Sequence, residues 1–292
     1  MSFRSAYRVF RRLNQKSLQL PIERLLDETN CNVDTGATPD QLDAMLSRIR
    51  VAWQSFGETE PHYSVLTNGV YRSNNFAKNR DKFYASGFAD VKRALPFLSR
   101  NMITPSTIRR VLDYGCGVGR LTVPLAKQFP FVTGIDISDK HLDYAKRHAA
   151  DQGVKNVDFM RMTDLKQLNS VNGIDFIFSL IVLQHNPPPI IAFTLRKLLG
   201  ALNPSGCALF QVPTFIRGFS FSAADYLSKP SPQMEMNAIP QRFVYDISRE
   251  CGCHILEVRE DGATGSASMV SHTFLVQKCA LPTIGDRDGD QI

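Results

Sequence analysis

The glycine-rich stretch at residues 109–126 constrains the fold of this chain more than any other feature. A short apolar strand pattern is followed by Gly115, Gly117 and Gly119, and then by the pattern of a helix start. Glycine at every second position lets the backbone turn sharply and lets a ligand approach it closely. The N-terminus of the following helix offers free N–H groups to a carboxylate or phosphate. The stretch therefore predicts a strand, a ligand-binding turn and a helix.

Two acids flank this turn and narrow the choice of ligand. Asp113 precedes the first glycine, where its charge would repel a pyrophosphate but favour an ammonium group. Asp136 ends a second predicted strand, where a carboxylate can accept hydrogen bonds from both hydroxyls of a ribose. Arg120 stands where a dinucleotide fingerprint places glycine or alanine, which argues against an NAD-dependent oxidoreductase. S-adenosylmethionine carries the amine, carboxylate and ribose that this pattern favours.

Three blocks of the sequence resemble the class I S-adenosylmethionine-dependent methyltransferases. They lie at residues 112–119, 134–138 and 175–185, in the order that the family has, and the resemblance covers roughly residues 78–279. It implies an α/β enzyme with a Rossmann-like, doubly wound, seven-stranded sheet whose last strand is antiparallel. It also implies S-adenosylmethionine as the cofactor and methyl transfer as the reaction.

The pattern of helices and loops predicts how the chain is divided. We expect an N-terminal helical extension and lid at residues 1–77, a methyltransferase domain at 78–280 that carries an insertion over the acceptor site at 213–240, and a flexible tail at 281–292. Thr38 and Pro39 are typical of a helix start, because they offer an N-cap side chain and a proline in the first turn. Ser86 is expected to cap a second helix over residues 88–98.

The residues predicted to bind the cofactor come from the turn and from the ends of the strands. Asp164 is assigned to the exocyclic amine of adenine, and Tyr84 to the methionine end, because similar residues occupy these positions in related methyltransferases. Asp164 could instead cap a helix. The full predicted set is Tyr84, Asp113, Gly115, Cys116, Gly117, Gly119, Asp136, Ile137, Asp164, Leu165 and Leu180.

The segment from Pro61 to Phe76 interleaves aromatic, amide and hydroxyl side chains, unlike a helix face or a strand. Loops of this composition ahead of a Rossmann-like core often form a lid or an acceptor pocket. An ordinary structured loop with satisfied polar groups is the alternative. The predicted acceptor contacts are His62, Tyr63, Tyr71, Arg72 and Asn75 from this segment, together with Asn186.

His185 follows the apolar run at 174–181, which is typical of a strand buried on both faces. Ligands of α/β proteins bind at such carboxyl ends of strands. An imidazole there suits a catalytic base at neutral pH, and His185 is the predicted catalytic residue. In the alternative interpretation, the Gln184–His185 pair only shapes the pocket.

Composition bounds the remaining properties. The chain is 43% apolar and 21% charged, which favours a folded domain, and no apolar run is long enough to cross a bilayer. The formal charge is +6 but the cations are dispersed, so nucleic acid is disfavoured as a partner. The six scattered cysteines favour a reducing cytoplasm, and Cys251 and Cys253 are too close for the usual zinc-ligand pair, so no metal site is expected. The basic segment at 1–16 suggests a surface helix, with organelle targeting as the alternative.

The sequence thus predicts a methyltransferase that acts on a polar small molecule, at a hydroxyl of a sugar or related metabolite. Two other functions stay open: a protein or RNA methyltransferase, and a catalytically silent partner subunit that keeps the fold. Whether the chain forms a homodimer is also left open.

Overall fold

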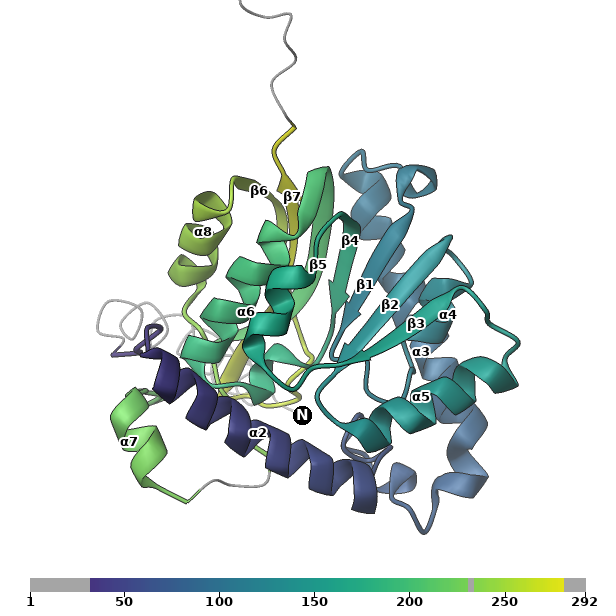
Figure 1. The fold of residues 1–292 in the computed structure, drawn as a ribbon, viewed down its shortest axis with the longest axis horizontal. Helices are drawn as coiled ribbons and strands as arrows, with labels where there is room; N and C mark the ends of the chain where they lie inside the picture. The colour runs from purple at the N-terminus through teal and green to yellow at the C-terminus, as the bar shows by residue number, and fades with distance from the viewer. Residues whose placement is uncertain (1–31, 231–233, 281–292) are drawn as a thin grey trace, which may run out of the picture.

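The computed structural model describes residues 32–230 and 234–280 of the 292-residue chain. The predicted basic helix at 1–16 and the predicted tail at 281–292 lie outside these residues. Within the described ranges, every helix is too short or too polar to span a membrane. A central sheet with helices on both faces forms the body of the molecule (Figure 1).

The sheet has seven strands in the order β3-β2-β1-β4-β5-β7-β6. The strands are β1 (Arg110–Tyr114), β2 (Phe131–Asp136), β3 (Val157–Arg161), β4 (Ile174–Ser179), β5 (Leu202–Ile216), β6 (Cys253–Asp261) and β7 (Met269–Lys278). β1 to β5 pair in parallel, whereas β7 is antiparallel to both β5 and β6. The strand order reverses between β1 and β4, where ligands bind in open α/β sheets. The predicted doubly wound sheet with an antiparallel last strand is confirmed.

Helices cover both faces because successive strand residues point in opposite directions. On β1, Val111 belongs to a core formed with α3 (Phe76–Arg100) and α4 (Thr122–Ala126), and Leu112 belongs to a core formed with α6 (Pro188–Gly200) and α8 (Gln241–Glu250). α5 (Asp139–Asp151) packs beside β3 and β2. Short 3₁₀ turns lie at η1 (Gly69–Tyr71), η2 (Pro105–Thr107), η3 (Leu165–Ser170) and η4 (Leu183–His185).

α2 (Pro39–Thr59) lies apart from these layers and runs across the lower edge of the sheet in the view of Figure 1. It begins as predicted: the Thr38 side chain accepts from the Gln41 N–H, the Gln41 side chain accepts from the Thr38 N–H, and Pro39 is in the first turn. Met45, Leu46 and Ile49 are buried against the core. The extension thus reaches the edge of the sheet at which the parallel strands end.

The helix expected at 88–98 is longer than predicted and begins at Phe76. Ser86 and Gly87 therefore lie inside α3, and the expected Ser86 cap is wrong, because the Ser86 hydroxyl donates to the Phe83 carbonyl within the helix. Gly87 gives α3 its close approach to the glycine-rich turn. A Cβ at Gly87 would lie 2.0 Å from the Arg120 carbonyl oxygen.

The segment predicted as an insertion, 213–240, is only partly separate from the sheet. β5 continues to Ile216, so the first residues of this segment extend a strand that was expected to end at Val212. The short helix α7 (Ala223–Ser228) follows and lies against α2. Arg48 of α2 donates to the carbonyl oxygens of Tyr226 and Leu227, at 2.7 and 2.6 Å.

The contact at Gly87 predicts a large cost for one added methyl group. We expect Gly87→Ala to lower the free energy of unfolding by about 1–3 kcal/mol, because the new methyl overlaps the Arg120 backbone. Gly200, at the end of α6, has no atom within 4 Å of its added Cβ, so Gly200→Ala is the matched control and should be neutral or stabilising. Urea denaturation measures both. Equal stability of the two variants would contradict the close packing of α3 on the turn.

Candidate active site

A cavity of about 810 Å³ opens at the carboxyl ends of β1, β2 and β4. The glycine-rich turn forms one side of it, and Ile49 and Trp53 of α2 form another. The segment after β4 contributes Leu180, Ile181 and Val182. The cavity thus lies at the reversal in strand order, where the topology predicts a ligand site.

The turn takes a shape that only glycine adopts without strain. Gly115, Gly117 and Gly119 all have positive φ, at 74°, 52° and 77°. A Cβ at Gly115 would lie 2.3 Å from Val182, so the side of the cavity also leaves no room for a side chain there. The N–H groups of Gly115 and Cys116 both donate to the Ile135 carbonyl, at 2.8 and 3.0 Å, which ties the turn to β2.

Asp136 is held at the end of β2 by two backbone N–H groups. Gly117 donates to one carboxylate oxygen at 2.8 Å, and Ser138 donates to the other at 2.9 Å. Each oxygen retains a further lone pair, and Asp136 lines the cavity together with Ile137. The carboxylate is therefore oriented before any ligand binds.

Asp113 lies beneath the turn rather than in the cavity wall. It is 1% exposed and accepts a hydrogen bond from the Thr122 hydroxyl at 2.6 Å. Burial raises the pKa of the Asp113 carboxyl to about 7, although the Thr122 hydrogen bond and the Arg120 charge act in the opposite direction. The residue thus places a titrating carboxyl under the ligand-binding turn.

Arg120 contributes a buried cation to the cavity wall. The residue is 2% exposed, and its guanidinium pairs with Asp90 of α3. Its Nε is buried without a hydrogen-bond partner among the described residues. The guanidinium therefore places a buried positive charge beside the cavity, which favours an anionic group of a ligand there.

His141, in the first turn of α5, carries an acceptor nitrogen, in contrast to the Arg120 donor. Its Nε2 lies 2.9 Å from the Ser64 hydroxyl and 3.2 Å from the Pro61 carbonyl oxygen. A carbonyl only accepts, so Nε2 carries the proton and Nδ1 carries the lone pair. This Nδ1 is buried without a partner in the described chain, and the residue lines the cavity beside Asp136. The ring therefore carries an acceptor that no described residue uses.

The His185 ring has its tautomer fixed by neighbouring amides. Gln211 accepts from the Ile181 N–H at 2.9 Å and donates to the Gln184 side-chain oxygen at 3.2 Å. Gln184 consequently turns its amide nitrogen toward His185 Nε2, at 3.3 Å. Nδ1 lies 2.8 Å from the Glu235 carbonyl oxygen, so it carries the proton and Nε2 is unprotonated. Burial lowers the pKa of His185, which keeps the ring neutral.

Some of the predicted site residues line the cavity, and the others lie outside it. Those that line the cavity are Gly115, Cys116, Gly117, Asp136, Ile137, Leu180, His185 and Asn186. Asp113 and Gly119 lie behind the turn, where Gly119 packs closely on Ala145. Asp164 caps η3 by accepting from the Lys166 N–H, and neither it nor Leu165 is part of the cavity lining.

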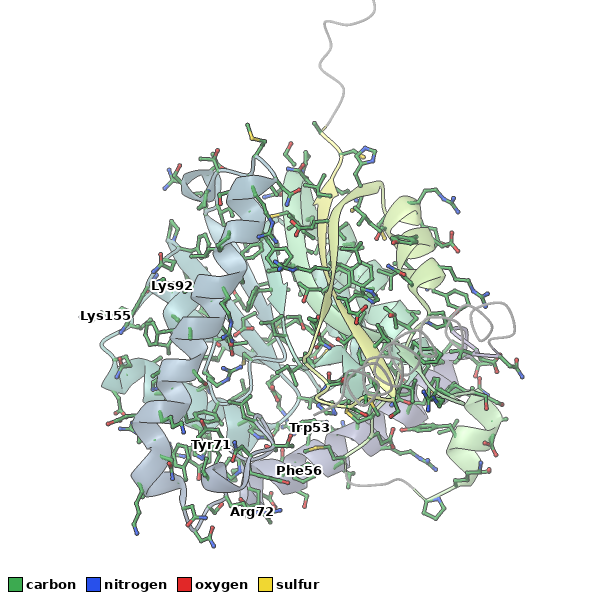
Figure 2. The ribbon with its side chains drawn as sticks, turned by 180° about the vertical axis from the view of Figure 1, so that it is seen from behind. Trp53, Phe56, Tyr71, Arg72, Lys92 and Lys155 are labelled. Atoms are coloured by element: carbon green, nitrogen blue, oxygen red, sulfur yellow. The ribbon has the colours of Figure 1, made fainter. Side chains whose placement is uncertain are left out.

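The loop residues predicted to contact the acceptor lie elsewhere. Tyr71 is buried against Phe83, and Arg72 lies over the Tyr63 ring and pairs with Glu60 at 3.7 Å. Figure 2 shows Tyr71 and Arg72 beside α3, whereas Trp53 lies on α2. Asn75 precedes α3, and His62 and Tyr84 line a separate cavity between α3 and α5. The cavity at the strand ends therefore contains none of the side chains predicted from the 61–76 loop, and it does not contain Tyr84.

The cavity-lining residues missed from the sequence include Trp53, Arg120 as a lining cation, and His141. Trp53 meets the His185 ring edge-on, with centroids 5.2 Å apart, across more than a hundred residues of chain. In the sequence, the position of Trp53 on the apolar face of a predicted helix indicated only a packing role. His141 carried a usable signal, because it follows the predicted acid Asp136 by five residues and lies in the first turn of the helix that Ser138 caps.

The strand order, the glycine-rich turn and the acid at the end of β2 together define the class I methyltransferase architecture. A family model described as a methyltransferase domain matches residues 111–206. Ubiquinone biosynthesis O-methyltransferase of Histophilus somni is 33% identical over 137 residues, which are 44% of this chain and 56% of that protein. The protein of the same name from Saccharophagus degradans is 32% identical, over 43% of this chain and 53% of its own length.

Solved structures agree on the fold. Magnesium protoporphyrin IX methyltransferase from Synechocystis, with bound SAH, superimposes with a TM-score of 0.55 at 18% identity, over 80% of this chain and 99% of that one. Residues 111–206 thus match a methyltransferase domain, and the chain has the Rossmann-like fold of that magnesium protoporphyrin IX methyltransferase. The sequence matches span only about half the length of the two curated relatives.

The buried carboxyl of Asp113 predicts a pH effect on the stability of the ligand-free protein. Its pKa is about 7 when folded and 3.8 ordinarily, so the unfolded chain releases this proton first. The contribution of Asp113 to the free energy of unfolding therefore falls as pH rises from about 4 to 7, by at most about 1.4 kcal/mol per pH unit.

Comparison with Asp113→Asn isolates this contribution from those of the histidines. Asparagine still accepts from Thr122 but does not titrate. Urea denaturation at several pH values should show the variant gaining stability relative to the parent as pH rises across this window. Parallel pH profiles would contradict the raised pKa.

Proposed function

We propose that this chain binds S-adenosylmethionine in the cavity at the strand ends and transfers its methyl group to a hydroxyl oxygen of a small molecule. The observation that carries the proposal is the Asp136 carboxylate, which two backbone N–H groups orient in the cavity lining beside the glycine-rich turn. The match of residues 111–206 to a methyltransferase-domain model supports the same conclusion.

The polar groups of the cavity fit the polar groups of this cofactor. The hydroxyls of a ribose are donors, and the Asp136 carboxylate offers acceptors in the lining. A methionine carboxylate is an anion, which the buried Arg120 guanidinium would attract. Asp113, beneath the turn, would favour the cofactor's ammonium group when ionised. Leu180 and Ile137 would supply apolar contacts.

When bound, the cofactor supplies an activated methyl group on a sulfonium. The protein then has to align the acceptor, exclude water and remove a proton from a hydroxyl. Trp53 and Ile49 of α2 lie over the cavity and exclude water from it. His185 Nε2 is the unprotonated nitrogen of a neutral ring whose Nδ1–H is held by Glu235, as a general base requires. We therefore assign His185 as the base. If the Gln184 amide kept its hydrogen bond to His185 Nε2 when the acceptor binds, Gln184 and His185 would only shape the pocket.

The acceptor is proposed as a small hydroxylated molecule. The expectation of a sugar depended on the polar loop at 61–76, whose predicted contact residues lie outside this cavity. The lining is instead dominated by apolar side chains, including Trp53, Met162 and Val182. This favours a hydroxyl on an apolar or aromatic ring, consistent with the O-methyltransferase names of the two curated relatives. A panel of phenols and sugars, assayed with labelled S-adenosylmethionine, separates these acceptors.

Asp136 provides the direct test of cofactor binding. We expect Asp136→Ala to weaken the binding of S-adenosylmethionine by about 1–3 kcal/mol, because buried ribose hydroxyls would lose their acceptor. Asp139→Ala is the matched control, since Asp139 is half-exposed and pairs with Arg161 outside the cavity. Isothermal titration calorimetry measures both. Unaltered affinity would remove Asp136 from the site, and the absence of saturable binding to the parent protein would overturn the proposed function.

His185 provides the test of proton removal. His185→Ala should lower turnover at saturating cofactor by about 100-fold or more while leaving cofactor affinity nearly unchanged. The assay uses the acceptor selected from the panel, and His254→Ala on the exposed face of β6 is the control. Turnover equal to that of the control would leave His185 as a pocket residue only.

A further inference from the structure

A second cavity, of about 770 Å³, lies between α3 and α5. It is lined by Arg80 and Tyr84 of α3 and by Tyr144, Arg147 and His148 of α5. No lining residue is shared with the cavity at the strand ends. It is therefore a separate site, and nothing in the proposed methyl transfer uses it.

Stacked rings form the base of this second cavity. His148 stacks on Tyr84 with centroids 3.5 Å apart and planes 17° from parallel, and His62 stacks on Phe76 with centroids 3.4 Å apart. Tyr144 meets the His62 ring edge-on. These packed rings hold the imidazoles in place, so the cavity is a built structure rather than a gap between mobile side chains.

The His148 imidazole has no hydrogen-bond partner for either nitrogen in the described part of the chain. The residue is 3% exposed, so both nitrogens are cut off from bulk water. A neutral imidazole offers one N–H donor and one lone pair. A buried polar group without a partner destabilises the fold, and a ligand in the adjoining cavity is a natural source of the missing partners.

Two arginines from opposite helices give the cavity a positive potential. Arg80 of α3 pairs with Asp151 at 2.6 Å, so its charge is partly compensated. Arg147 of α5 lies over the Tyr144 ring and donates to the Asp143 carbonyl, and no carboxylate of the described residues lies within 4 Å of its guanidinium. With Asp151 as the acid in the lining, the arginines leave one net positive charge.

Burial keeps both histidines of this cavity neutral. Burial, aided by the positive charge of Arg80, lowers the pKa of His148 to about 4 and that of His62 to about 3. Lys127 adds to the effect on His148, and Asp151 opposes it. Both rings are therefore neutral at pH 7, and each offers one N–H donor and one lone pair.

We propose that this second cavity binds the phosphate group of a small phosphorylated metabolite. Donors approach from three directions: Arg80 from one helix, Arg147 from the other, and the His148 ring from below. A tetrahedral phosphate monoester has three terminal oxygens to meet them, whereas a planar carboxylate is matched by a single arginine fork. The remaining lone pair of His148 accepts from a hydroxyl of the same metabolite.

Calorimetric titration of the full chain with glucose 6-phosphate, inorganic phosphate and glucose tests this site. We expect saturable binding of the two phosphates and none of glucose. Arg147→Gln should weaken phosphate binding about tenfold or more, because it removes the uncompensated charge. Lys155→Gln is the matched control, an exposed cation just beyond α5 that Figure 2 shows at the outer edge of the molecule. Equal affinities of the two variants, or no saturable binding, would overturn the proposal.

A second variant keeps the test independent of folding and of the first cavity. His148→Phe preserves the stack on Tyr84 but removes both nitrogens, so the ligand-free variant should melt at a higher temperature than the parent and lose the stabilisation by glucose 6-phosphate. Asp136→Ala should bind glucose 6-phosphate like the parent, which separates this site from the proposed cofactor site. Full retention of the glucose 6-phosphate effect in His148→Phe would contradict the assignment.

Discussion

The hydrogen bond from the Gly117 N–H to the Asp136 carboxylate is the interaction on which the rest of the site depends. It joins the turn after β1 to the end of β2, and the N–H groups of Gly115 and Cys116 add two bonds to the Ile135 carbonyl. Together these bonds fix the turn against β2 and hold the Asp136 carboxylate at the cavity. The strand register that pairs Tyr114 with Ile135 brings the two strand ends level, so the geometry follows directly from the sheet.

The second determinant is the position of α2 across the carboxyl edge of the sheet. Arg48 binds the carbonyl oxygens of Tyr226 and Leu227, and Arg50 binds that of Thr163 at 3.2 Å. Charged donors on backbone carbonyls hold the helix at two places without filling the space between them. Trp53 can therefore lie over that space and meet His185. A segment outside the matched methyltransferase domain thus forms part of the cavity wall.

The sequence was sufficient where structure is decided locally. A sharp turn at three glycines, an N-cap at Thr38 and an apolar strand beginning at Ile174 all follow from short-range rules, and each occurs, although the strand predicted to reach residue 181 ends at Ser179. The loop at 61–76 was harder, because its composition did not determine which side chains face the cavity. Tyr71 packs against Phe83, and Arg72 forms an ion pair with Glu60. These partners are chosen by tertiary packing, which neither composition nor spacing encodes.

His141 and His148, both on α5, also show that composition and spacing do not predict which surroundings a side chain enters. They are two turns apart on α5, but one lines the cavity at the strand ends and the other lines the cavity beside α3. The wall between the cavities is the segment from Pro61 to Val65. The Pro61 side chain faces the second cavity while its carbonyl fixes the tautomer of His141 in the first. Any influence of a ligand in one cavity on the other has a direct route through this short segment, because it contributes lining residues to both.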